Sequence, residues 1–110
     1  MNEPARGLML NLATVDPEHE EQFNRWYHEE HIPDVRRRFP QIVSARRFRA
    51  TDGQEPAYLM FYEYDVASEA ELNELASPDN PLRQEIWKIY DEAVGSFARR
   101  WRRCFWQIEP

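Results

Sequence analysis

Two segments of this sequence are apolar at nearly every position, and they limit what the chain can fold into more than any other feature. Residues 7–15 read GLMLNLATV, and residues 57–65 read AYLMFYEYD. Short apolar runs of this kind are typical of strands, but a strand with one solvated face alternates apolar and polar residues. Because these segments do not alternate, we expect both faces of their sheet to be covered.

The first half of the chain also carries the signals of a helix and a second strand. Asp16-Pro17 is a typical helix start, and the acidic residues that follow it suit the positive end of the helix dipole. Residues 36–38 are three arginines at the opposite end, and Phe39-Pro40 stops the helix. Residues 41–51 then form a strand that pairs with residues 57–65 through the turn-forming TDGQEP.

The second half predicts two helices and a last strand. Ser68 and Glu71 form a capping box before a short helix, and Asn80-Pro81 opens a longer one. Gly95 is a plausible C-terminal cap, and the last strand covers roughly residues 97–108. The longer helix has an apolar stripe at helical spacing, formed by Leu82, Ile86, Ile89, Tyr90 and Ala93.

This order of elements predicts an α+β fold of the ferredoxin-like βαββαβ type, with an antiparallel sheet and its helices on one face. The chain of 110 residues is long enough for one domain, which we place at residues 1–110. No element is left to cover the second face of the sheet. We therefore expect a second copy of the chain to cover it, which makes the protein a homodimer.

Composition excludes several classes of protein. Charged residues make up 31% of the chain, and no apolar stretch approaches the length of a membrane span, so we expect no membrane partner. The N-terminus lacks the pattern of a signal peptide and Cys104 is the single cysteine, which together favour a cytoplasmic protein without disulfides. A formal net charge of −6 argues against nucleic-acid binding.

Arginines are concentrated in two of the expected strands, as RRFR at residues 46–49 and RRWRR at residues 99–103. In the usual strand order of this topology both strands lie at the edges of the sheet. Charge on an edge strand discourages unwanted pairing and can bind acidic residues of a partner subunit. The alternative is that at least one of these arginines binds an anion.

A proline interrupts the first helix at an unexpected place. Residues 23–39 read FNRWYHEEHIPDVRRRF and put Pro33 two residues after His31. Proline cannot donate to the carbonyl of Glu29 and disfavours helical geometry at Ile32, so we expect the helix to kink or restart after His31. Loosened carbonyls and Asp34 would then raise the pKa of His31 above about 6.5, unless burial reverses the shift.

A titratable group held at the rim of an aromatic pocket is what general acid–base catalysis needs. On a helical wheel His31 lies at the margin of one face, while His28 points outward. The face itself is formed by Phe23, Trp26, Tyr27 and Glu30. A structural role remains open, in which His31 is a core histidine that bonds a free carbonyl. No third ligand accompanies His28 and His31 at a metal-binding spacing, so we expect no metal site.

The segment FNRWYHEEHIPDV, followed by Phe39-Pro40 and IVSARRFR, resembles the EthD-like group of the dimeric α/β-barrel superfamily. The motif of that group is W-Y-x-x-x-H-[IL]-P, which here corresponds to Trp26, Tyr27, His31, Ile32 and Pro33. The resemblance implies two ferredoxin-like sheets that face each other as a barrel, with a cleft between the helices and the sheet of each subunit. Relatives in the superfamily include cofactor-independent monooxygenases, isomerases, polyketide cyclases and haem-handling enzymes.

Together these features predict a small cofactor-independent enzyme that binds a hydrophobic aromatic, polyketide or lactone-like molecule. His31 is the expected general acid or base, oriented by Asp34 or a backbone carbonyl, and Tyr27 lies one turn away. The chemistry would be of the isomerase, lyase, cyclase or monooxygenase type. The expected walls of the cleft are Phe23, Trp26, Tyr62, Trp87 and Tyr90. The alternative is a non-catalytic carrier or accessory protein of an oxidative degradation pathway.

Overall fold

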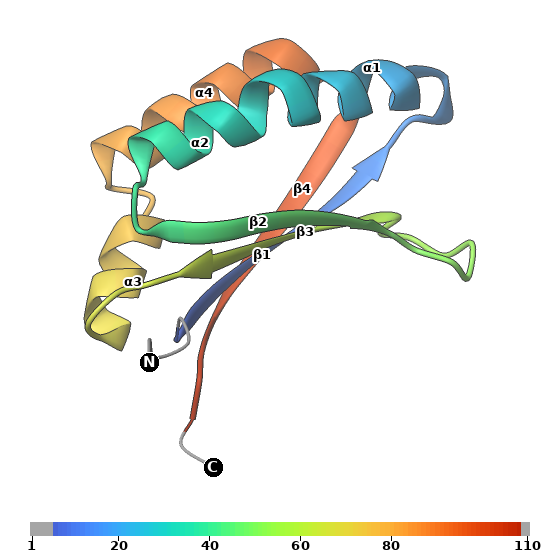
Figure 1. Ribbon diagram of the computed structural model, residues 1–110. Coiled ribbons are helices and arrows are strands. Elements are labelled where there is room, and N and C mark those ends of the chain that lie inside the picture. The colour runs from blue at the N-terminus through green and yellow to red at the C-terminus, as the bar shows by residue number, and fades with distance from the viewer. Residues whose placement is uncertain (1–5, 109–110) are drawn as a thin grey trace.

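One antiparallel sheet forms the base of the molecule (Figure 1). The computed structural model describes residues 6–108. The strand order is β2-β3-β1-β4, so the two apolar strands are central and the two arginine-rich strands lie at the edges, as the sequence predicts. The strands are β1 (Gly7–Val15), β2 (Ile42–Arg49), β3 (Tyr58–Tyr64) and β4 (Ala98–Trp106).

The helices cover one face of this sheet. The first begins as a short 3₁₀ turn at Pro17–His19 and continues as α1 (Glu20–Trp26), a π-helical turn (Tyr27–His31) and α2 (Ile32–Arg38). The others are α3 (Glu69–Ala76) and α4 (Pro81–Val94). In Figure 1, α4 runs beside α1 and α2 above the sheet, and α3 lies at one end. This is the expected ferredoxin-like α+β fold. Among the described helices, none has the length and apolar character to cross a bilayer.

Local signals in the sequence account for most helix ends. The Ser68 hydroxyl accepts a hydrogen bond from the Glu71 amide at 3.2 Å, and the Asn80 side chain accepts from two amides at the start of α4. These side chains satisfy amides that have no partner within the helix. Asp16 and Gly95 occupy the predicted N-cap and C-cap positions. Asp16 makes no side-chain capping bond, and Gly95 keeps right-handed dihedrals with φ of −60° instead of adopting the left-handed cap conformation.

The core lies between the helices and the sheet. Alternate residues of the two central strands face the helices, because successive side chains of a strand point to opposite faces. Met9, Met60 and Tyr62 are at most 2% exposed. The helices meet them with a second buried set, formed by Phe23, Tyr27, Val35, Leu72, Ile86, Tyr90 and Val94.

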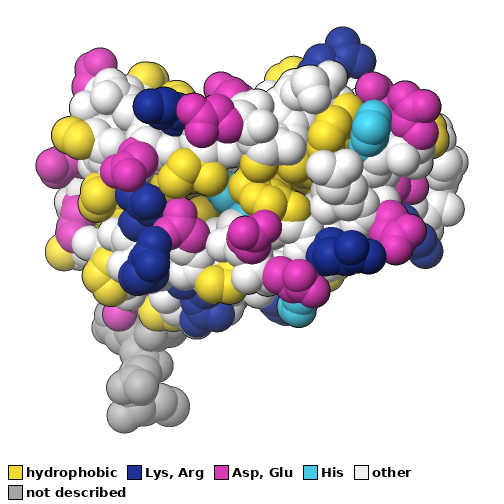
Figure 2. All heavy atoms as spheres, turned by 90° about the horizontal axis from the view of Figure 1, so that it is seen from above, with side chains coloured by type: hydrophobic (Ala, Val, Ile, Leu, Met, Phe, Trp, Pro, Cys, Tyr) yellow, Lys and Arg dark blue, Asp and Glu magenta, His cyan; other side chains and the backbone are white. Residues whose placement is uncertain are grey.

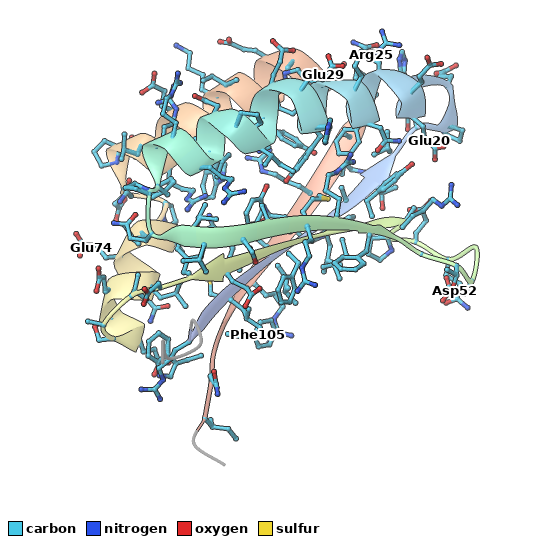
Figure 3. The ribbon with its side chains drawn as sticks, viewed as in Figure 1. Glu20, Arg25, Glu29, Asp52, Glu74 and Phe105 are labelled. Atoms are coloured by element: carbon cyan, nitrogen blue, oxygen red, sulfur yellow. The ribbon has the colours of Figure 1, made fainter. Side chains whose placement is uncertain are left out.

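The opposite face of the sheet is also apolar, and no described element covers it. Trp101 is 50% exposed, Phe48 46% and Phe105 37%. Figure 3 shows Phe105 pointing away from the helical layer. The two central strands form the middle of this outer face with the apolar side chains Leu8, Leu10, Leu12, Leu59 and Phe61. The prediction of strands that are apolar on both sides is thus confirmed.

The edge arginines divide between the two faces of the sheet. Arg46 faces outward, with its guanidinium carbon 5.0 Å from the centre of the Phe61 ring. Arg47 faces the helices, where it donates to the Asn24 side chain at 2.6 Å. Arg100 and Arg102 also lie on the helical face. The arginines of each edge strand therefore lie in two different environments, because neighbouring residues of one strand point to opposite sides.

Candidate active site

The first helix passes Pro33 without a break. The Ile32 amide bonds to the Tyr27 carbonyl, five residues earlier, and the dihedrals of Trp26, Tyr27, His31 and Ile32 all remain helical. The predicted kink or restart is therefore replaced by a π-helical turn. Proline lacks an amide hydrogen and its ring crowds the preceding turn, and a wider turn provides room for it.

The wider turn changes which side chains face inward. Tyr27 is 1% exposed and His31 is 6% exposed, so His31 is buried and does not lie at the margin of the face. Glu30, which a regular helical wheel puts on the aromatic face, is exposed instead. The added residue in the turn rotates the positions that follow it, and this rotation brings the His31 ring over the sheet.

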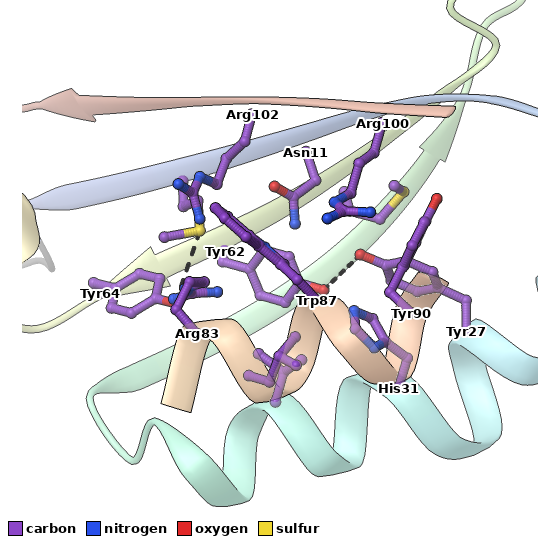
Figure 4. A pocket seen from close by; sticks show the side chains of 14 residues that line it. Asn11, Tyr27, His31, Tyr62, Tyr64, Arg83, Trp87, Tyr90, Arg100 and Arg102 are labelled. Atoms are coloured by element: carbon purple, nitrogen blue, oxygen red, sulfur yellow. Dashed lines mark hydrogen bonds between the residues drawn. The ribbon is translucent and has the colours of Figure 1, made fainter. Parts of the chain in front are cut away.

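His31, Tyr27 and Tyr62 line one small cavity between the helices and the sheet (Figure 4). Its free volume is about 20 Å³, which is room for roughly one water molecule. The other polar or aromatic side chains on its walls are Asn11, Tyr64, Arg83, Trp87, Tyr90, Arg100 and Arg102.

Aromatic rings surround the imidazole of His31. The Trp26 indole stacks on it, with ring centres 4.8 Å apart and planes at 25°, and the Tyr27 ring meets it edge-on at 4.6 Å. Burial lowers the pKa of His31 to about 4; the charge of Asp34 opposes this shift, and that of Arg100 adds to it. Burial thus reverses the rise in pKa that the sequence suggests, and His31 is neutral at neutral pH.

Asp34 does not orient the imidazole. Its carboxylate is bound by the guanidinium groups of Arg37 and Arg38, the latter with an N–O distance of 3.0 Å. The residue lines a groove between α2 and α4 and does not line the cavity. Asp34 therefore acts on His31 only through its charge.

The tyrosine hydroxyls of the cavity are neutral. Those of Tyr27 and Tyr62 lie 2.8 Å apart in a hydrogen bond. Burial raises the pKa of both groups, and that of Tyr62 lies well above its usual value. Burial also raises the pKa of Tyr90, whose buried hydroxyl has no hydrogen-bond partner within residues 6–108. Tyr90 can thus donate to, or accept from, a molecule that enters the cavity.

Some of the predicted wall residues line the cavity, and others lie behind it. Tyr62, Trp87 and Tyr90 line the cavity. Phe23 is fully buried and packs against Tyr27 at 5.5 Å between ring centres, but it does not reach the cavity. Trp26 supports His31 from the outer side of the helix.

Sequence reasoning missed the most polar part of the cavity. Arg83 is 3% exposed and belongs to the buried face of α4. The apolar pattern had predicted Leu82 on that face, but Leu82 is 41% exposed. Asn11 interrupts the apolar run of β1 at a position that faces the helices. Arg100 and Arg102 are two residues apart, so they share a strand face. The spacing of Arg100 and Arg102 was the sequence signal that could have identified a second set of site residues.

A metal centre has no obvious ligands in the described part of the chain. No three His, Cys, Asp or Glu side chains between residues 6 and 108 lie close enough together to hold an ion. The polar groups of the cavity are tyrosine hydroxyls, arginines, one amide and one imidazole.

A family model described as a domain of unknown function, DUF4286, matches residues 9–103. The chain belongs to the DUF4286 family. No curated protein matches it significantly. An EthD family protein, of the group that the first helix resembles, is among the solved structures of the same fold.

Three solved structures illustrate this likeness. An EthD family protein from Bacillus halodurans has a TM-score of 0.57 and 20% identity, over 88% of this chain and 96% of that one. A monooxygenase from the gene ActVA-Orf6 of Streptomyces coelicolor, in complex with nanaomycin D, has a TM-score of 0.64 and 16% identity, over 96% and 90%. A dimeric ferredoxin-like protein from an uncultured marine organism has a TM-score of 0.63 and 14% identity, over 98% and 99%. At these identities the likeness establishes the fold alone.

Proposed function

We propose that this DUF4286 protein binds a hydrophobic small molecule in the cavity and transfers a proton on it through His31 without a cofactor. The observation that carries the proposal is a buried neutral imidazole whose ring centre lies 5.8 Å from that of Tyr90, with both residues lining one cavity. The ligand is an aromatic, polyketide or lactone-like compound. The reaction is an isomerisation, lyase, cyclase or oxygenation step that starts with removal of a proton.

His31 acts first as a base, because its neutral form predominates at neutral pH. An imidazole with a low pKa is a weak base in the empty cavity. When the ligand loses its proton, the anion beside the ring raises the pKa of His31 and so favours the transfer. Arg100, whose guanidinium lies 4.6 Å from the centre of the Tyr90 ring, contributes positive charge beside that anion.

His31 also has a route for returning the proton to solvent. It lines the inner cavity and, on its other side, a groove between α2 and α4 that Trp26, Pro33 and Ile89 also line. Figure 2 looks onto this layer and shows hydrophobic side chains gathered between the helices, with charged side chains around them. A ring that borders both spaces can exchange its proton on either side.

The nearest rival is a carrier that binds the same ligand without changing it. Asp34 is occupied by Arg37 and Arg38, so it does not fix the tautomer of His31. A carrier needs no such fixing. A structure of this fold that holds nanaomycin D supports ligand binding in either case.

A thermal-shift screen of phenols, quinones, polyketides and lactones, followed by a turnover assay on each hit, tests the proposal. We expect His31→Ala to lower turnover by roughly 10²-fold to 10⁴-fold, the usual contribution of a positioned acid or base. His28→Ala is the control, because His28 is exposed on the same turn. Full turnover in both variants would exclude proton transfer by His31, and tight binding without turnover in the wild type would favour the carrier.

We propose in addition that two copies of the chain pack through the outer faces of their sheets. Leu10, Phe61 and Trp101 belong to an apolar surface that no described element covers. Surfaces of this kind mark interaction sites. A neighbour of the same fold is a dimeric protein, which supports this arrangement.

A further inference from the structure

The inner cavity contains an excess of positive charge. Arg83, Arg100 and Arg102 line it, and no Asp or Glu does. Arg100 has a counter-ion outside the cavity, since its guanidinium donates to Asp91 at 2.6 Å. The charges of Arg83 and Arg102 have no carboxylate partner among the described residues.

The hydrogen bonds of these two arginines go to neutral groups. Arg83 donates to the Leu75 carbonyl and to the Tyr64 hydroxyl, both at 3.1 Å. Arg102 donates through Nη2 to the Ala76 carbonyl at 2.6 Å, while its Nη1 is buried without a partner. Two like charges in a partly buried site are costly unless an anion lies near them.

The two arginines lie at the same end of the cavity. Figure 4 shows Arg102 reaching down from β4 and Arg83 reaching up from α4, with Tyr64 beside Arg83. The imidazole of His31 and the rings of Tyr27 and Tyr90 form the opposite end. The cavity thus has a cationic end, where two arginines lack a carboxylate partner among the described residues, and an aromatic end, where Arg100 pairs with Asp91 and His31 is the proposed base.

We propose that Arg83 and Arg102 form a carboxylate-binding subsite, so that the ligand is an aromatic acid whose carboxylate lies at the cationic end. The inference rests on the proposed ligand-binding role of the cavity. A carboxylate accepts charge-assisted hydrogen bonds from guanidinium groups, and these bonds are stronger than those between neutral groups. The unpaired Nη1 of Arg102 is the donor that this carboxylate engages.

Trp87 controls access to this subsite. Its ring centre lies 4.5 Å from the guanidinium carbon of Arg102 and 5.3 Å from that of Arg100. The same three residues also line a groove on the outer side of α4 and β4. Since the free space inside holds about one water molecule, an aromatic acid enters only when the indole moves toward this groove.

Two probes of the same shape and different charge test the subsite. We would measure binding of 4-fluorobenzoate and 4-fluorobenzamide by ¹⁹F NMR titration. The acid should bind about tenfold or more tightly than the amide, because charge-assisted hydrogen bonds are stronger than neutral ones. In Arg102→Gln the preference should disappear while the affinity for the amide stays unchanged. Arg102→Lys should retain only part of the preference, since it keeps the charge but not the guanidinium donors.

Arg25→Gln is the matched control for removal of a positive charge. Arg25 is exposed on α1, where it pairs with Glu21, and its loss should leave the preference for the acid intact. Melting temperatures of all variants identify any that fail to fold. A third probe, 4-fluorophenyl phosphate, distinguishes between anions, because tighter binding of the phosphate than of the acid would overturn the carboxylate assignment.

The outcomes separate this inference from the proposed function. Equal affinities of acid and amide for the wild type would overturn the carboxylate subsite alone. Failure of all three probes to bind the folded wild type would overturn the ligand-binding role of the cavity and the subsite with it. If His31→Ala keeps the preference for the acid and full turnover, the subsite stands while proton transfer by His31 fails.

Discussion

The hydroxyl groups of Tyr27 and Tyr62 lie 2.8 Å apart, which joins the π-helical turn to the centre of the sheet. Both residues are buried, with 1% and 2% of their surface exposed. One hydrogen bond therefore fixes the height of the first helix above β3 at the place where His31 enters the cavity. The geometry of the candidate base depends on this contact between a helix and a strand.

Substitution of one tyrosine by phenylalanine removes the partner that the other buried hydroxyl has in this hydrogen bond. We expect Tyr27→Phe and Tyr62→Phe each to lower the free energy of unfolding by about 1–3 kcal/mol. The double variant should lose less than the sum, since either single substitution already removes the bond. Urea denaturation of the four proteins measures this coupling. Strictly additive losses would contradict a hydrogen bond that contributes to stability.

The depressed pKa of His31 predicts how stability depends on pH. The folded protein takes up a proton on His31 near pH 4 and the unfolded chain near pH 6.5, so the unfolded state binds more protons between these values. Stability contributed by neutral His31 is complete above about pH 6.5 and falls as the pH drops toward 4. The full loss is roughly 3 kcal/mol.

His31→Gln isolates this contribution from those of the other ionisable groups. Between pH 7.5 and pH 5, the free energy of unfolding measured by denaturation should fall more for the wild type than for His31→Gln. Parallel losses, or an NMR titration of His31 with a midpoint above 6.5, would show that burial does not dominate its ionisation.

Pro33→Ala tests whether the π-helical turn sets the position of His31. Alanine restores an amide hydrogen and has high helix propensity, so stability should stay the same or rise. A regular α-helix would rotate His31 relative to the sheet, and ligand binding or turnover should therefore fall. A crystal structure of the variant is the direct measurement. Unchanged activity in a variant with a regular helix would limit the turn to a structural role.

Trp101→Glu should disrupt the proposed dimer. The side chain is half exposed in a single copy, so a charge there costs little within one chain but is unfavourable between two apolar sheet faces. Sedimentation at micromolar concentration should show a shift from dimer to monomer. Leu82→Glu is the control, because Leu82 is a 41% exposed apolar residue on the helical side. A folded wild-type monomer under these conditions would contradict the proposed dimer.

Arg47 illustrates that the sequence predicts an edge strand but not the face of the sheet to which its side chains point. Its strand and its edge position follow from composition and element order, and the structure agrees with both. Its direction depends on register, since a shift of one residue moves a side chain to the other face. The bond from Arg47 to Asn24 shows that the side chain supports α1. Arg47→Glu should accordingly affect folding more than assembly.

The candidate site was predictable only in part. Tyr27 and His31 follow from a motif, Tyr62 was expected as an aromatic wall residue, and all three line the cavity. Arg83 did not follow, because a hydrophobic stripe is recognised by apolar residues and a buried cation is omitted from it. The π-helical turn could not be predicted either, because Pro33 indicates an irregular helix without showing whether the helix breaks or widens.

Alternation along β1 allows changes in specificity and changes in assembly to accumulate separately. Met9 and Asn11 border the cavity, while Leu8, Leu10 and Leu12 lie on the other side of the same strand. A substitution at position 11 alters the chemistry available to a ligand and leaves the outer surface untouched. Related chains can therefore diverge in what they bind while they conserve how they associate, and a protein engineer can vary either property alone.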